Sequence, residues 1–175
     1  MEYYSQVPEV PYRYAPWGRR VFSAFIDSIA ISFVSAPFIG EAARRVFDAI
    51  SENRSVASAD VRAITVANLV VSVLYMTAFG AWRGSTLGKM AARTVLVRDD
   101  GSPVTGGVAF VRAVTFGVIQ FVSGILVVPL VFNELRPLWH PRRQTWHDQV
   151  ARTVVVVRAD RLARAAGDAA QPPEE

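Results

Sequence analysis

The sequence contains no cysteine among its 175 residues. Without thiols the chain cannot form a disulfide, a thiolate metal site or a cysteine nucleophile. It also has no paired nucleophile and base and no cluster of metal ligands, and residues 84–89 lack the two spaced glycines of a nucleotide-binding loop. We therefore expect a protein that is not an enzyme and that carries no cofactor or metal.

Lysine is almost absent as well, since Lys89 is the single lysine among 19 basic residues. The others are arginines, which stay protonated at any ordinary pH, so the net charge of +4 is permanent. Most of these residues lie beside apolar runs and do not follow one face of an element. This arrangement favours anchoring at an anionic membrane surface and argues against binding to nucleic acid.

Long apolar runs make up much of the chain, of which 51% is hydrophobic. Residues 21–39 form a run interrupted by one ionisable group, Asp27, and the run is long enough to cross about 30 Å of hydrocarbon. A secretory signal has a shorter apolar core without a carboxylate, so we expect an uncleaved anchor. Residues 63–82 carry no charge and predict a second span. Between them, Val46, Phe47 and Ile50 have the spacing of one helix face, which predicts a short helix at the membrane surface within residues 41–62.

A third apolar block covers residues 108–132. It is either one span or two half-length helices bent at Ser123 and Gly124, and short helices at membrane depth are tolerated where protein covers their ends. We favour the bent hairpin, because it returns the chain to the cytoplasm and leaves fifteen of the nineteen basic residues inside. It also brings all four tryptophans to the cytoplasmic interface.

Two segments repeat one another: ARTVLVRDD from Ala92 and ARTVVVVRAD from Ala151. Such segments can recur by chance in a chain rich in Arg, Ala and Val. We favour two strands, at residues 93–98 and 152–158, that pair because a lone strand leaves its backbone groups without partners. The sequence thus predicts an all-α membrane protein, a small bundle of transmembrane helices with a short cytoplasmic two-stranded β ribbon. The domain covers residues 17–158, between a disordered cytoplasmic tail (1–16) and a polar C-terminal tail (159–175).

Three ionisable residues are candidates for a functional site. Arg20 and Asp27 lie seven positions apart on one helix face, about 10 Å along the axis. A carboxylate in hydrocarbon costs about 2.5–3.5 kcal/mol, so Asp27 needs a partner or water, either in an ion or proton pathway or as a packing clamp. Asp148 precedes the second predicted strand, next to His147, where it is either a helix cap or a site residue. We expect Arg20, Asp27 and Asp148 to form one electrostatic cluster.

The motifs RRVFSAFID, STLGKMAARTVLVRDDGSPV and WHDQVARTVVVV occur in this order, and together they resemble the RDD family of small bacterial membrane proteins. The resemblance covers residues 17–157 and implies that Arg20, Asp27 and Asp148 are the arginine and the two aspartates of the family name. Asp99 and Asp100 are not part of that triad. The family more often has glutamine where this chain has Ser85. The resemblance further implies transport of an unknown ligand and, in some members, exchange of monovalent cations for protons.

Two functions follow as expectations. The first is a small transporter, with proton-coupled cation exchange as its concrete form, in which Asp27 takes up the proton or small cation. Two or three spans cannot enclose a pore, so we expect a homo-oligomer or a partner membrane protein in the lipid bilayer. The second is a non-transporting scaffold or accessory subunit, in which the triad clamps the first helix to the strands. Either way we expect a multi-pass protein of the inner or plasma membrane with a cytoplasmic N-terminus.

Overall fold

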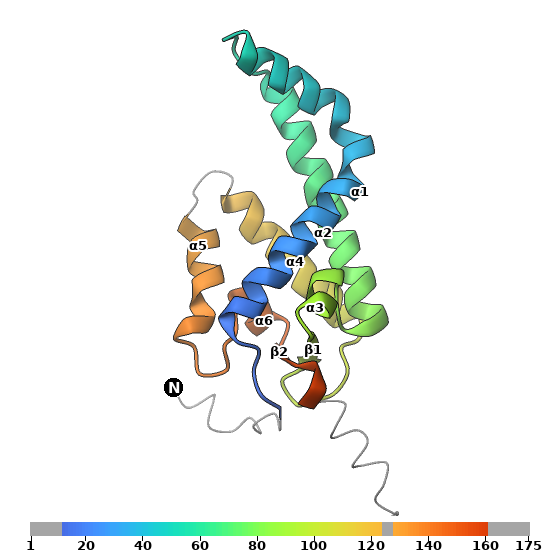
Figure 1. Ribbon diagram of the computed structural model, residues 1–175, viewed down its shortest axis with the longest axis vertical. Coiled ribbons are helices and arrows are strands. Elements are labelled where there is room, and N and C mark those ends of the chain that lie inside the picture. The colour runs from blue at the N-terminus through green and yellow to red at the C-terminus, as the bar shows by residue number, and fades with distance from the viewer. Residues whose placement is uncertain (1–11, 124–127, 161–175) are drawn as a thin grey trace, which may run out of the picture.

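The computed structural model describes residues 12–123 and 128–160. It is mostly helical, with one small sheet (Figure 1). In chain order the elements are α1 (Trp17–Ser51), α2 (Ser58–Arg83), α3 (Leu87–Ala91), β1 (Thr94–Arg98), α4 (Gly106–Ser123), α5 (Val128–Leu135), the single turn η2 (Arg136–Leu138), α6 (Trp146–Val150) and β2 (Thr153–Val157).

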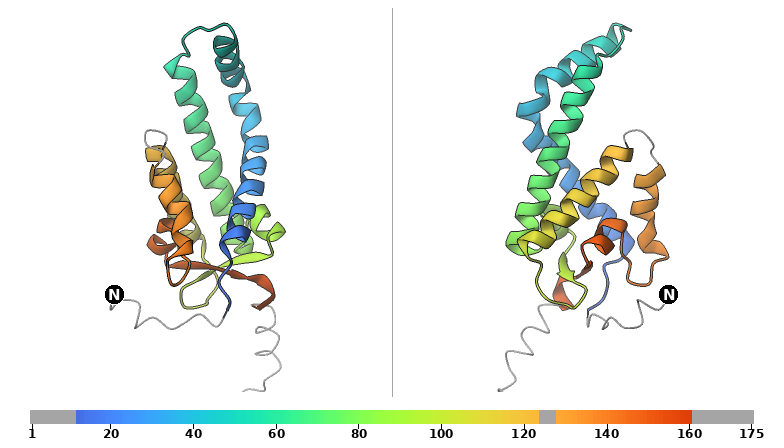
Figure 2. Two further views of the ribbon diagram at one scale, coloured as in Figure 1. Left: turned by 60° about the vertical axis from the view of Figure 1, so that its left-hand side comes forward. Right: turned by 180° about the vertical axis from the view of Figure 1, so that it is seen from behind.

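The helices α1, α2 and α4 are each long and apolar enough to cross a membrane. Large apolar side chains point outward along them, as Phe33 (77% exposed), Phe38 (73%) and Leu74 (64%) illustrate. Water does not favour so much exposed apolar surface, whereas lipid does. The chain is therefore an integral membrane protein, as the sequence predicts. Figure 2 shows α1 and α2 standing side by side and extending away from the strands.

The helix α1 is longer than expected, because it passes through Pro37 and continues to Ser51. The separate surface helix predicted within residues 41–62 is therefore wrong: residues 41–51 belong to α1, which Figure 1 shows as bent. Proline removes one hydrogen bond and kinks a helix without always ending it. Beyond the proline, Glu41 pairs with Arg44 and Arg45, at the spacings that stabilise a helix.

The third apolar block is two helices, α4 and α5, and not one straight span. The start of α4 and the end of α5 both lie near the strands (Figure 2). This follows from the connectivity, since β1 precedes α4, β2 follows α5, and the two strands pair. The structure thus agrees with the bent hairpin, but its two helices are unequal: α4 has 18 residues, more than the expected half-length, and α5 has 8. The helix α4 ends at Ser123, as expected, and Gly124 lies outside the described residues.

The predicted ribbon is confirmed: β1 and β2 pair antiparallel, with Leu96 opposite Val155. One face of the ribbon carries four buried valines that pack with Tyr12 and Tyr14. The other face, with Leu96 and Val155, packs on Ala15, Val104 and Ala109. Residue alternation in a strand gives the ribbon these two buried faces.

The chain lies along β2 before α1 begins. The amide of Ala15 donates to the Val155 carbonyl (2.9 Å), and the amide of Val157 donates to the Arg13 carbonyl (2.9 Å). The expected boundary of the N-terminal tail at residue 16 is therefore too late, because residues 13–15 already belong to the sheet edge. Residues 1–11 of that predicted tail and residues 161–175 lie outside the described part of the chain.

The sequence echo is part of a longer structural repeat with a constant offset of 59 positions. Each copy has a threonine N-cap, a five-residue helix, an arginine with positive φ and a five-residue strand. Leu96 and Val155 are equivalent in the repeat and also face one another in the ribbon. A local two-fold axis therefore passes between them. The matched pairs are Gly84 and Arg143, Ser85 and Gln144, Thr86 and Thr145, Lys89 and Asp148, Arg93 and Arg152, and Thr94 and Thr153.

Candidate functional site

Asp148 is fully buried in the first turn of α6, where it completes a capping box with Thr145. The Thr145 hydroxyl accepts from the Asp148 amide, and Oδ2 of Asp148 accepts from the Thr145 amide at 3.3 Å. This reciprocal pair fixes the first turn of the helix and the direction of the carboxylate. The cap considered from the sequence is therefore real, and it positions Asp148 for its other contacts.

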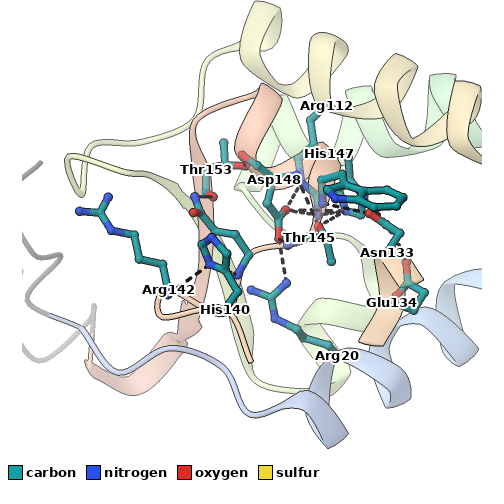
Figure 3. Close-up of polar contacts among 12 residues, drawn as sticks. Arg20, Arg112, Asn133, Glu134, His140, Arg142, Thr145, His147, Asp148 and Thr153 are labelled. Atoms are coloured by element: carbon teal, nitrogen blue, oxygen red, sulfur yellow. Dashed lines mark hydrogen bonds and ion pairs between the residues drawn. The ribbon is translucent and has the colours of Figure 1, made fainter. Parts of the chain in front are cut away.

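Two arginines from different helices reach this carboxylate from two sides (Figure 3). Nη1 of Arg20 on α1 lies 2.8 Å from Oδ2, and Nε of Arg112 on α4 lies 2.9 Å from Oδ1. Burial acts to raise the pKa of Asp148, but the positive charges of Arg112 and Arg20 outweigh it and hold the pKa well below its usual range. Asp148 is therefore a permanent anion that joins α1, α4 and α6.

His147 lies beside this pair, with its Nε2 at 3.0 Å from Nη2 of Arg112. A guanidinium group only donates hydrogen bonds, so Nε2 accepts and the imidazole is neutral. Burial, followed by the positive charge of Arg112, holds the pKa of His147 well below its usual value. His147 therefore positions Arg112 and is not itself charged.

Asp27 is also buried, but its partners come from α2 and α3. The hydroxyl of Tyr75 donates to Oδ1 (2.7 Å), the hydroxyl of Thr86 donates to Oδ2 (2.6 Å), and the amide of Gly88 donates to Oδ1 (2.8 Å). Lys89 is farther away, with Nζ at 4.0 Å from Oδ2. Gly88 is required here, because a Cβ at that position would overlap the Ser23 carbonyl. Three donors thus fix Asp27 between three helices.

The three residues predicted from the sequence therefore meet only in part. Arg20 contacts Asp148, as expected, whereas no contact joins Arg20 to Asp27 among the described residues. Two further residues, Lys89 and Arg112, complete the cluster and were not predicted as site residues. The repeat offers a signal for Lys89, since it is the single lysine of the chain and is equivalent to Asp148.

Lys89 lies between the two carboxylates. Its ammonium makes one long hydrogen bond, to the Thr86 hydroxyl at 3.4 Å, within the part of the chain that the structure describes. Burial, and next the positive charge of Arg112, lower the pKa of Lys89 to about 8. Lys89 lies on the short helix α3, outside the spanning helices. Because its pKa is close to neutral pH, its charge responds to small changes of pH.

A cavity of about 410 Å³ adjoins the cluster, between α1 and the α4–α5 hairpin. Polar groups from five elements line it, together with an apolar wall. A second cavity of about 360 Å³, between α1, α2 and α4, shares Ser28, Phe116 and Gln120 with the first. The polar and charged residues of the first cavity include Arg20, Asp27, Lys89, Arg112, Glu134 and His147. No three His, Asp or Glu side chains within residues 12–123 and 128–160 lie close enough together to hold a metal ion.

The model of the RDD family matches residues 14–152. The chain belongs to the RDD family. The match spans α1 to α6 and ends at Arg152, so it includes every residue of the buried cluster. Neither the curated proteins nor the solved structures contain a match to this chain. The RDD membership agrees with the resemblance seen in the sequence and with a membrane location.

Proposed function

We propose that this RDD protein is a small membrane transporter whose solute passes along α1 through the two adjoining cavities. The observation that carries the proposal is the polar lining that the cavities share at membrane depth. Ser28 and Gln120 line both, and Ser32, Thr65 and Asn68 line the second cavity beyond them. Ser28, Ser32, Thr65 and Asn68 also bond to carbonyls of their own helices, which lets them lie within a bilayer. Their gathering around two adjoining cavities favours a solute pathway.

The length of this path supports the proposal. From Arg20 to Ser32 it follows α1 for about 18 Å, at 1.5 Å per residue, out of about 30 Å of hydrocarbon. The remaining distance passes between α1 and α2, because α4 has ended at Ser123. We propose that this remaining segment is closed in the present conformation. A transporter keeps its path closed at one end and opens that end in another conformation.

Lys89 is the group that we propose for proton coupling, in place of Asp27. Both oxygens of Asp27 already accept hydrogen bonds from fixed donors, so Asp27 has little capacity left to bind a solute. Lys89 makes one long hydrogen bond and lines the first cavity, so its charge can respond to the solute. The exchange of a monovalent cation for a proton, expected from the sequence, is one form of this transport.

The orientation follows the positive-inside rule: we place the N-terminus, the ribbon and Glu175 in the cytoplasm, and the protein in the plasma membrane. A homo-oligomer or a partner membrane protein then covers the open side of the path, since two spans and a short hairpin leave it exposed to lipid. A C-terminal reporter fusion that is active only outside the cytoplasm would contradict this orientation.

The transport assay uses purified protein in liposomes that contain a pH-sensitive dye and are challenged in turn with sodium, potassium and protons. Gln120→Leu and Asn68→Leu should each lower the flux at least tenfold, because they replace the polar lining with apolar side chains. Thr115→Val is the matched control on α4, since Thr115 is a polar residue of the same helix that lines neither cavity. Equal fluxes in all three variants would contradict the path.

A specific observation also favours the second candidate, a non-transporting scaffold. Asp27 and Asp148 each tie together three helices through short hydrogen bonds, as purely structural clamps do. If the protein is a scaffold, no liposome challenge should produce a flux above that of empty liposomes. Asp27→Asn and Arg20→Ala would then lower protein abundance to a similar extent.

A further inference from the structure

The cavity between α1 and the α4–α5 hairpin has unused hydrogen-bond donors on its polar side. Arg20 lines it, and the side chain of Arg20 is 10% exposed. Its Nη1 is bound to Asp148, but Nε and Nη2 are buried without a hydrogen-bond partner within residues 12–123 and 128–160. Buried donors without partners are rare and destabilise the folded protein, more so when the group is charged. An unsatisfied guanidinium edge at a cavity favours an acceptor that carries negative charge.

Lys89 adds a second donor to the same cavity. Its ammonium has three N–H groups, and its one hydrogen bond among the described residues is the long contact with Thr86. Neither aspartate of the cluster has much capacity left for these donors. Asp27 accepts from three groups, and Asp148 accepts from both arginines and the Thr145 amide.

Apolar side chains from three helices also line the cavity. They are Phe25 on α1, Phe116 on α4 and Leu130 on α5. The cavity thus combines cationic donors with apolar side chains within about 410 Å³, a volume typical of small-molecule sites.

We propose that this cavity binds an amphipathic molecule through a monoanionic oxygen acid, either a carboxylate or the phosphodiester of a lipid. Arg20 and Lys89 donate hydrogen bonds to the anion. Phe25, Phe116 and Leu130 pack against its apolar body. This inference names the ligand class of the transport proposed above and rests on the same cavity, although binding can be measured without transport.

Binding should be linked to the protonation of Lys89. A nearby anion stabilises the ammonium form, so the complex takes up protons where free Lys89 is partly neutral, around and above pH 8. The affinity should therefore fall as the pH rises from 7 to 9. The charged or titratable groups that surround Lys89 are Arg20 and Asp27 on α1, Arg112 on α4, Glu134 on α5, and His147 and Asp148 on α6.

The first test is calorimetric titration of benzoate into purified protein in lipid-free detergent micelles. Arg20→Lys keeps a cation beside Asp148 but removes the unused guanidinium donors, and Lys89→Met removes the ammonium. Each variant should weaken benzoate binding about tenfold or more, the usual effect of losing a charged hydrogen bond. Arg19→Gln, at the exposed neighbouring position, is the matched control and should bind as the wild type does. Lys89→Met should also abolish the change of affinity between pH 7 and 9.

The second arm uses native mass spectrometry of protein purified with phosphatidylglycerol or with phosphatidylcholine. Retention of phosphatidylglycerol that Arg20→Lys and Lys89→Met abolish identifies a lipid as the source of the anion, and benzoate binding identifies a free acid. The inference is overturned if the wild type binds neither probe, or if both variants bind as the wild type does. A failure of transport is seen separately: benzoate binding without any liposome flux refutes the transporter and leaves the anion site intact.

Discussion

Arg20 and Asp148 are 128 positions apart in the chain, yet Nη1 of Arg20 lies 2.8 Å from Oδ2 of Asp148, which is fully buried, while the Arg20 side chain is 10% exposed. Replacing Asp148 by Asn should lower the free energy of unfolding by about 3–5 kcal/mol, because Arg20 and Arg112 then become buried charges without a counter-ion. Thermal unfolding in detergent, followed by tryptophan fluorescence, measures the loss. A change below 1 kcal/mol would mean that the arginines find other partners.

Asp27→Asn should be milder, with a loss of about 1–3 kcal/mol. The amide keeps the shape of the carboxylate and one acceptor oxygen. The hydroxyl of Tyr75 or Thr86 that then faces the NH2 group can rotate and accept a hydrogen bond from it. The same unfolding assay compares it with Asp148→Asn. If both variants lose equal stability, Asp27 interacts with Lys89 more strongly than their separation of 4.0 Å suggests.

Gly88→Ala should prevent stable folding, because the added Cβ would overlap the Ser23 carbonyl and crowd Asp27. The short helix α3 would have to move away from α1, and the Gly88 hydrogen bond to Asp27 would break. The control is Gly107→Ala, where a Cβ has no neighbour within 4 Å in the described part of the chain. Size-exclusion chromatography and yield after membrane extraction separate the two variants, and a monodisperse, well-expressed Gly88→Ala protein would refute the close packing.

Stability should rise with pH between about 8 and 10.5 through Lys89. Its pKa is about 8 in the folded protein, below the ordinary 10.5, so the unfolded chain binds more protons in this interval. Unfolding therefore becomes less favourable as the pH increases, by up to about 3 kcal/mol. The difference between wild type and Lys89→Met, measured at pH 7.5 and pH 10, isolates this contribution. An identical pH dependence in the two proteins would contradict it.

A cysteine pair can test the ribbon without interference, since the chain has no native cysteine. Leu96 and Val155 face each other, while the Leu96 amide donates to Gly84 and the Val155 carbonyl accepts from Ala15. They are therefore a non-hydrogen-bonded pair, whose side chains are close enough for a disulfide. Leu96→Cys with Val155→Cys should cross-link under mild oxidation, seen as a mobility shift on a non-reducing gel. Leu96→Cys with the exposed Val150→Cys should not.

Local sequence pattern accounts for most of the fold. The uncharged run before Trp82 and the repeated ARTV segments predict α2 and the ribbon, because span length and strand alternation are local properties. The extension of α1 beyond Pro37 was missed, since a proline is compatible with both a kink and an end. The ion pairs of Glu41 with Arg44 and Arg45, which follow the proline, stabilise the continued helix.

The site was predicted less completely, because its contacts depend on tertiary structure. Asp148 could be joined to Arg20 through the expected ribbon, and the structure shows that pair. The partners of Asp27, in contrast, come from Tyr75 and from the turn at Thr86, whose position no local pattern indicates. Arg112 was visible as a charge at the start of an apolar block, but its carboxylate partner lies 36 positions away.

The pairing of β1 with β2 has a consequence for biosynthesis. During translation, α1, α2 and α4 emerge from the ribosome before residues 153–157, so β1 must wait for its partner while the helices already enter the bilayer. Arg20 and Arg112 also lack their carboxylate partner during this time, since Asp148 is synthesised after both. A chain that stops short of α6 keeps two arginines without their carboxylate and an open strand edge, so it is less stable and more prone to aggregate than the complete protein.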